Sequence, residues 1–403
     1  MYIHAFTRCF EGIGKRPTLL LVIGLTLTMT MGISSLVPSL PMLAREFGLE
    51  EQASWRIIAT FALPGLVCIP FVGVWADRYG RKKVLIPGLF LFCIGSLACC
   101  FAQSFDQMLA FRFIQGAGSV PLGLLYSTIV ADTWQGEERA RVMSLCAVTL
   151  GLGTALSPVL GGALTMLNWR LVFLLPLLAL PLVVLAVRLP LMRPVEKTSL
   201  ALYAAKSLAL ARQPQTLLLL ALTLLTFIML SGPVITCFPL LAESLFQARP
   251  LDPGLIISAA SLASGLSASY LPRLYKRYRP RTLLLTAMAL YTAAFCIMPH
   301  MPGLFWLIGP LILYGLAQGL NIPLVSTLLV GQAPDERRAA LMALNALLLR
   351  LGQYLGPAIF GTLVALLGPG GAITSGALLA LATALLLLCR SLPDLQGQEQ
   401  NLH

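Results

Sequence analysis

Long apolar runs dominate the chain and alternate with short segments that hold most of its charged residues. A membrane-spanning helix needs about 20 successive, mostly apolar residues. On this measure the pattern predicts twelve spanning helices, which begin near Thr18, Ala53, Lys83, Phe105, Glu137, Arg170, Pro214, Pro253, Arg281, Gly303, Glu336 and Gly370, the last ending near Arg390. We therefore expect an all-α membrane protein.

The composition supports this prediction and locates the charge. Only 11% of the 403 residues are charged, against about 25% in an average soluble domain. The net charge of +12 would suit a nucleic acid, but 22 of the 28 Lys and Arg residues fall on one predicted side and four on the other, with Arg112 and Arg350 inside the membrane. The positive-inside rule then places both termini in the cytoplasm. We expect a multi-pass protein of the inner (plasma) membrane whose partner is the lipid bilayer, not nucleic acid.

An internal repeat divides the chain in two. An offset of 199 residues aligns identical residues along much of both halves, among them Gly116 with Gly315, Ser127 with Ser326 and Pro158 with Pro357. We expect an N-terminal six-helix bundle over 1–190, a cytoplasmic linker over 191–213, and a C-terminal six-helix bundle with a short cytoplasmic tail over 214–403. Duplicated membrane proteins of this kind bind a substrate between their repeats and expose it to each side in turn. A transporter of a small molecule is the first interpretation.

Three segments carry a family resemblance. "GVWADRYGRKK" (73–83) lies between the second and third predicted helices, "RFIQGAGS" (112–119) in the fourth and "GTALSPVLGG" (153–162) in the fifth. Together they resemble the major facilitator superfamily, and the third resembles the motif of its drug:proton antiporter branch. The resemblance implies twelve helices in two bundles and proton-coupled efflux of a small organic molecule. Ser157 departs from the motif, where a glycine commonly precedes the proline.

The first motif also implies a conformational latch. In the family, the loop acid faces the start of helix 11 and the loop arginine reaches an acid at the end of helix 4, which match Asp77, Arg81 and Asp132. The second copy of the loop has Lys276 where the first has Asp77, so only the first can supply the acid. The candidate latch for the state closed to the cytoplasm comprises Gly73, Asp77, Arg78, Gly80, Arg81 and Asp132.

Two arginines fall inside predicted spans and point to a polar cavity. A charge in a bilayer is costly, so such side chains usually face a protein interior or a water-filled space. Residues at helical spacing extend the two polar faces, and the candidate cavity comprises Thr26, Thr30, Ser34, Arg112, Gln115, Ser119, Tyr126, Tyr314, Gln318, Asn321, Arg350, Gln353 and Tyr354. For the threonines and serines, hydrogen bonds between helices are the better interpretation. For the arginines we favour a functional role.

The fifth-helix motif has two interpretations. Its residues are Gly153, Ser157, Pro158, Gly161 and Gly162. Small residues let membrane helices approach closely, and proline kinks a helix. We favour helix packing, while a role in preventing a proton leak is implied only by the resemblance.

The acids narrow the expected substrate. None of the sixteen lies in the middle of a predicted span, and the first helix has only hydroxyls where exporters of cationic drugs often carry a carboxylate. A cavity with two arginines and no acid favours an anionic, zwitterionic or neutral solute over a cation. Proton coupling remains an expectation from the resemblance. An uptake symporter or facilitator, and a non-transporting membrane sensor or scaffold, are the alternatives.

An enzyme does not fit the sequence. It has no GxxxxGK[ST] phosphate loop and no HExxH motif, and its three histidines are His4, His300 and His403. The nine cysteines form no CxxC pair. We expect no cofactor, no metal, and a monomer.

Overall fold

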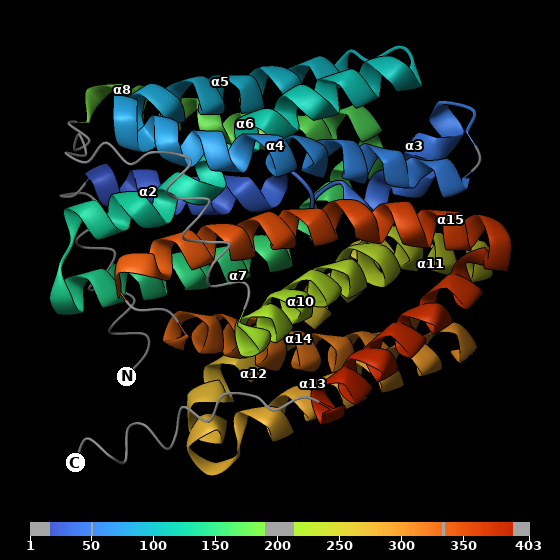
Figure 1. Ribbon diagram of the computed structural model, residues 1–403. Coiled ribbons are helices and arrows are strands. Elements are labelled where there is room, and N and C mark those ends of the chain that lie inside the picture. Colours follow the sequence, from blue (N-terminus) through green and yellow to red (C-terminus); the bar gives the residue numbers. More distant parts are fainter. Residues whose placement is uncertain (1–16, 50, 190–212, 333–334, 390–403) are drawn as a thin grey trace, which may run out of the picture.

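The protein is described by a computed structural model over residues 17–49, 51–189, 213–332 and 335–389, and these residues contain helices and no β-strand (Figure 1). The first half contains α2 (Pro17–Met31), η1 (Val37–Ser39), α3 (Leu40–Glu46), η2 (Glu51–Ser54), α4 (Trp55–Tyr79), α5 (Arg81–Cys100), α6 (Phe105–Thr133), α7 (Gly136–Leu167), η3 (Trp169–Ala179) and α8 (Leu180–Arg188). The second contains α10 (Pro214–Met229), η4 (Leu230–Cys237), α11 (Phe238–Phe246), α12 (Leu251–Arg277), α13 (Pro280–Ile297), η5 (Met298–His300), η6 (Leu304–Leu307), α14 (Ile308–Gly331) and α15 (Asp335–Cys389). The predicted linker and tail fall largely outside the described residues.

The helix starts follow local signals in the sequence. The predicted start at Phe105 coincides with that of α6, where the Ser104 side chain accepts a hydrogen bond from the Gln107 backbone N–H at 3.3 Å. The predicted start at Pro214 coincides with that of α10. Gly80 separates α4 from α5 with φ 96° and ψ 146°, a backbone conformation that residues other than glycine rarely adopt. That glycine produces the tight turn of the first motif.

The predicted spans are longer or more broken in the structure than in the sequence pattern. Nine helices in the described ranges are long and apolar enough to cross a membrane, or ten if the bent pair in α4 is one span. The first apolar run divides into α2, η1 and α3, and so α2 has only 15 residues. The last two runs join in α15, where Gly368 breaks the helix with φ 71° and ψ 170°. The described residues therefore confirm an all-helical protein with several membrane-spanning helices, but not the predicted number of twelve.

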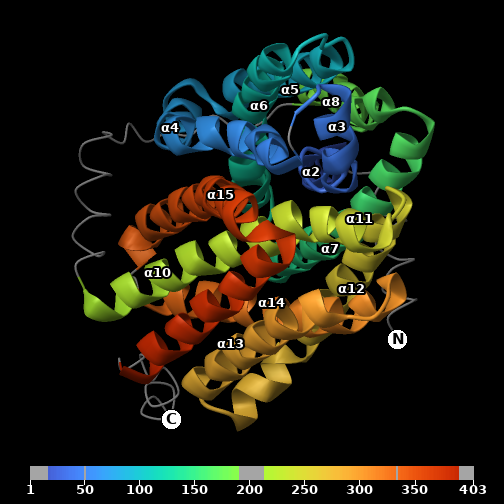
Figure 2. The ribbon, with the colours of Figure 1, turned by 90° about the vertical axis from the view of Figure 1, so that its right-hand side faces the viewer.

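The apolar core separates with the chain. One cluster of buried residues comes from 218–387, while the other three come from 19–189. Figure 2 shows the same separation, with most of the blue-to-green helices above most of the yellow-to-red ones. Between them, α4 packs along α15 and α7 packs along α12. We call this region between the two halves the seam.

Candidate functional site

Arg81 lies at the turn between α4 and α5 and forms two ion pairs there. We call the end of the molecule that contains this turn the inner end. The Arg81 guanidinium donates from Nε to Asp132 at 2.9 Å and from Nη1 to Asp77 at 2.6 Å. The Arg81 side chain is only 10% exposed, although both carboxylates remain partly open to solvent. The arginine thus ties the turn to the end of α6, which is the contact that the resemblance implied. The side chains at 335–340, which Asp77 was expected to face, lie outside the described residues.

Arg112 is buried inside the N-terminal half, and its contacts are with residues of that half. Its guanidinium donates from Nη1 to the Gly32 carbonyl at 3.0 Å and to Gln115 Oε1 at 2.7 Å, and from Nε to the Ile57 carbonyl at 3.4 Å. It also lies over the Phe61 ring, 4.4 Å from the centroid. The residue is 1% exposed and joins α2, α4 and α6. In this conformation it supports the packing of the half and does not line an open space.

Arg350 crosses the seam. The residue belongs to α15, but a Cβ added to Gly65 on α4 would lie 3.1 Å from its Cγ and Cδ. A Cβ added to Gly123 on α6 would lie 3.6 Å from its Nη2. Among the described residues, its guanidinium donates a hydrogen bond from Nη1 to Gln353 Oε1 at 3.2 Å. A half-buried guanidinium from one half thus lies against two helices of the other.

The remaining candidates separate by burial. Thr26, Thr30, Gln115, Ser119, Tyr314 and Asn321 are buried within their own halves. Asn321 donates from Nδ2 to Thr226 Oγ1 at 2.6 Å, and Thr223 donates to Oδ1 of Asn345 at 2.7 Å. These bonds join neighbouring helices, as the packing interpretation of the hydroxyls predicts. Ser34, Tyr126, Gln318, Gln353 and Tyr354 are partly exposed and, with Arg350, stay candidates for contact with a solute.

The motif of α7 packs on two sides. A Cβ at Gly161 would lie 1.8 Å from the Ser35 carbonyl oxygen, and one at Gly153 would lie 2.5 Å from Thr30 Oγ1. Ser157, the departure from the family motif, has its Oγ 3.3 Å from the Thr30 hydroxyl. On the other side, a Cβ at Gly162 would lie 2.5 Å from the Pro250 carbonyl oxygen in the other half. The packing role proposed for this motif therefore has specific contacts.

The α7–α12 contact is close at one end only. Gly254 on α12 is as crowded as Gly162, because its Cβ would lie 2.5 Å from the Pro158 carbonyl oxygen. One turn farther along α12, Ser258 donates to the Ala155 carbonyl oxygen. On the same faces toward the inner end, Gly151 and Gly265 have open space, with nothing within 4 Å of an added Cβ. The two helices thus diverge toward the inner end.

The α4–α15 contact repeats this asymmetry. A Cβ at Gly361 would lie 2.0 Å from Trp55 Cδ1, near the end opposite the α4–α5 turn, which we call the outer end. At Gly73, near the inner end, an added Cβ meets nothing within 4 Å. The seam is therefore closed at the outer end, lined by Arg350 in its middle, and wider at the inner end. The sequence did not indicate Gly65, Gly123 or Gly254, because their contacts exist only between distant segments.

Helices that are long and apolar enough to cross a membrane, packed in two halves with separate cores, indicate a multi-pass membrane protein. The family model of the Major Facilitator Superfamily matches residues 22–247 and again 236–401. The chain belongs to this superfamily.

Individual relatives include transporters that are about 30% identical to this chain or less. The multidrug resistance protein MdtL of Shigella flexneri is 28% identical over 378 residues, which are 90% of this chain and 92% of that protein. The bacillibactin exporter of Bacillus subtilis is 30% identical over 154 residues, 36% of this chain and 38% of that protein, so the match spans well under half of its length. The crystal structure of the human organic anion transporter MFSD10 (TETRAN) has a TM-score of 0.69 at 22% identity, covering 92% and 99% of the two chains. At that identity the likeness shows the fold alone.

Proposed function

We propose that this protein exports a small organic molecule by alternating access, with the seam as the solute path. The observation that carries the proposal is the asymmetry of the seam, which is closed by backbone contacts near Gly162 and Gly254 and open at Gly151 and Gly265. A solute could enter such a seam from the inner end but not leave at the outer end. Rocking of the two halves would reverse this arrangement.

The architecture we propose is twelve spans in two six-helix bundles, 1–190 and 214–403, joined by a cytoplasmic linker. Separate cores for 19–189 and 218–387 support this division, as does the glycine break at Gly368, which would separate the last two spans. The charge distribution supports cytoplasmic termini in the inner membrane. The inner end would then face the cytoplasm, so this conformation would be open inward. We propose that the chain acts as a monomer.

Efflux, with protons as the coupling ion, is the direction we propose. The relatives that support it are named as a multidrug resistance protein and a bacillibactin exporter. The inward-opening seam is compatible with loading of solute from the cytoplasm. A transporter of this kind performs no covalent chemistry, so we assign no enzymatic activity or cofactor.

For the substrate we propose an anionic, zwitterionic or neutral amphiphile. Arg350 carries this inference, because its guanidinium lies in the seam without a carboxylate within 4 Å among the described ion pairs. An uncompensated cation repels a cationic drug and attracts an anion most strongly where water is scarce.

Flux into or out of reconstituted vesicles tests the proposed function. With an imposed pH gradient, we expect gradient-driven movement of an anionic dye such as carboxyfluorescein and little movement of ethidium. Flux that ignores the gradient would identify a facilitator and remove the proton from the account. Preferential ethidium transport that is unchanged by substitution of Arg350 would contradict the proposed substrate class.

We propose that the α4–α5 turn acts as a latch for the inward-closed state. In the present conformation Asp77 pairs with Arg81 on its own side of the seam, which leaves it positioned to meet the start of α15 when the inner end closes. Asp77→Asn should therefore leave the inner end open for longer and reduce flux, while Arg139→Gln, which changes an exposed charge near the start of α7, should not. Distances between spin labels on the inner ends of α4 and α15 measure the effect. An unchanged distance distribution together with unchanged flux would remove the latch.

A further inference from the structure

An ion pair joins the two halves at the outer end. Arg45 on α3 donates from Nη1 to Glu243 Oε1 on α11 at 2.7 Å. The side chains differ in exposure, with Arg45 63% exposed and Glu243 only 14% exposed. The pair lies at the same end as the tight crossing of α7 and α12, so both features hold the outer ends of the halves together.

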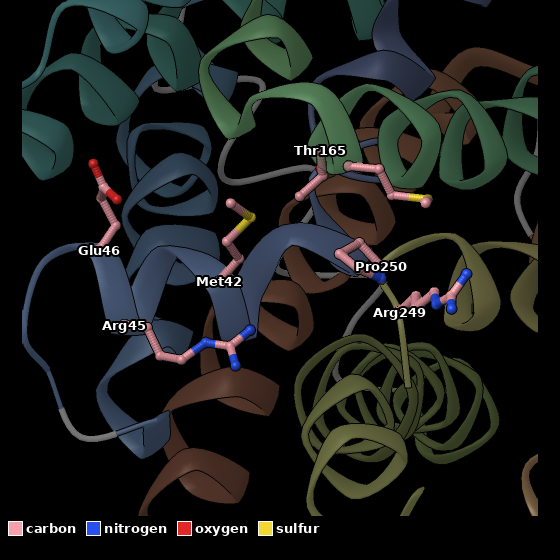
Figure 3. A pocket seen from close by; sticks show the side chains of 7 residues that line it. Met42, Arg45, Glu46, Thr165, Arg249 and Pro250 are labelled. Atoms are coloured by element: carbon pink, nitrogen blue, oxygen red, sulfur yellow. The ribbon is translucent and has the colours of Figure 1, made fainter. Parts of the chain in front are cut away.

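The other outer acid is placed differently. Glu46 follows Arg45 in sequence but approaches Arg170 at 3.6 Å within the same half, and both side chains are 42% exposed. Figure 3 shows that Arg45 and Glu46 leave α3 in different directions. Breaking the Glu46 pair would therefore not release one half from the other. Glu46 provides a matched comparison for Glu243.

An open cavity gives external water access to the pair. The cavity has a volume of about 510 Å³ and is lined by Met42, Arg45, Glu46, Thr165, Met166, Arg249 and Pro250 (Figure 3). These residues come from both halves, so the cavity lies over the closed part of the seam. The cavity therefore brings the outer solution to Arg45, whose partner Glu243 is 14% exposed, while the seam below stays closed.

The charged groups on the elements near Glu243 lie on α3 and at the connection from α11 to α12. Arg45 contacts it from α3, where Glu46 points elsewhere, and Arg249 and Asp252 lie at the connection, where Asp252 accepts a hydrogen bond from the Arg249 backbone N–H at 2.8 Å. Arg170 belongs to the neighbouring pair with Glu46. Arg45 is thus the cation whose salt bridge depends on the charge of Glu243.

We propose that Arg45 and Glu243 form a proton-sensitive outer gate. The ionised Glu243 carboxylate attracts Arg45 and favours the outer-closed state, so this contribution is present while Glu243 is ionised and is lost as external pH falls through its titration. A proton that binds Glu243 from outside removes the attraction and favours separation of the outer ends. No acid lies in the middle of a predicted span, so Glu243 would be a place outside the span centres where a proton acts. It rests on the proposed function only for its place in a transport cycle.

Access of a thiol reagent to the seam tests the gate without any transported solute. Ser261 on α12 is half-buried, and its hydroxyl donates to the Thr154 carbonyl oxygen across the seam at 3.4 Å. In full-length chain with the native cysteines replaced, Ser261→Cys reports outer opening through its rate of labelling by a membrane-impermeant maleimide added outside right-side-out vesicles. Leu167→Cys, at the exposed outer end of α7, corrects for the effect of pH on thiol reactivity.

Labelling should be slow at about pH 7.5 outside and faster at about pH 4, close to the ordinary pKa of a glutamate. Glu243→Gln should raise the rate at the higher pH by roughly fivefold, a factor of the size expected for an ion pair with one exposed partner, and should remove the pH dependence. Arg45→Gln should do the same, whereas Glu46→Gln should label like the parent chain. Exchanging the charges, with Arg45→Glu and Glu243→Arg together, should slow labelling again.

Two results would overturn the gate. One is labelling of both Glu243→Gln and Arg45→Gln at the parental rate with the parental pH dependence. The other is rapid labelling of residue 261 in every variant, which would mean that the outer seam is open throughout. A chain that moves no solute in the flux assay would contradict the proposed function and leave these labelling results unaffected. The two ideas can therefore fail separately.

Discussion

Arg350→Gln is expected to reduce transport of an anionic solute by roughly 30-fold, which corresponds to about 2 kcal/mol for a lost charge-assisted hydrogen bond. The guanidinium lies in the middle of the seam, against Gly65 and Gly123 of the other half. Among the described residues it bonds to the neutral side chain of Gln353 and has no ion pair, so its charge is available for a solute. Initial rates of carboxyfluorescein flux in vesicles, measured over a range of concentrations, give the change.

Two substitutions make this prediction specific. Arg350→Lys keeps the charge but loses the planar guanidinium, so we expect an intermediate rate. Arg56→Gln removes an exposed arginine at the outer end of α4, more than two helical turns from Gly65, and should transport like the parent chain. Equal losses in Arg350→Gln and Arg56→Gln would mean that net charge, and not the seam, determines the rate.

Gly162→Val is expected to abolish most transport by preventing closure of the outer end. A Cβ at this position would lie 2.5 Å from the Pro250 carbonyl oxygen and 2.8 Å from the Leu251 Cα, and neither backbone atom can turn aside as a side chain can. Overpacking of this kind costs about 3 kcal/mol, which corresponds to a roughly 100-fold loss of the outer-closed population. Flux and outside labelling of residue 261 should change in opposite directions, with less flux and faster labelling.

Gly151→Val is the matched control for the labelling readout, because it lies on the same helix but its Cβ meets nothing within 4 Å in this outer-closed conformation, so it should not speed labelling of residue 261. Both substitutions carry the same cost in helix propensity, so the difference between them reports the close contact. Gly254→Val should behave like Gly162→Val, since its Cβ would lie 2.5 Å from the Pro158 carbonyl oxygen. Loss of flux without faster labelling would indicate misfolding or a different role for the motif.

Helix positions could be predicted from the sequence because apolar run length and local caps determine them. Phe105 and Pro214 begin helices where the pattern places them, and Gly80 makes the turn that the first motif requires. The last two predicted runs fall in α15, where the helix breaks at Gly368 with φ 71°, two residues before the predicted start at Gly370. Apolar run length thus gives the approximate positions of the spans. It does not show breaks such as the division of the first run into α2, η1 and α3.

Arg112 and Arg350 look alike in the sequence but have different surroundings in the structure. Arg112 and Arg350 have similar sequence surroundings, each with a glutamine three residues later, and both were assigned to the cavity. The structure buries Arg112 against carbonyls of its own half, while Arg350 crosses the seam. Helical spacing shows which residues share a face, but the neighbour that covers this face is determined by tertiary packing. The Arg45–Glu243 pair depends on the same kind of long-range contact.

During transport, the seam should close at one end as it opens at the other. Spin labels at Leu167 and Leu255 report the outer ends of α7 and α12, and labels at Val148 and Leu266 report their inner parts, all four positions being exposed. When solute and a pH gradient are applied, the outer distance should lengthen while the inner distance shortens. If both distances change in the same direction, or neither changes during measured flux, the account is contradicted.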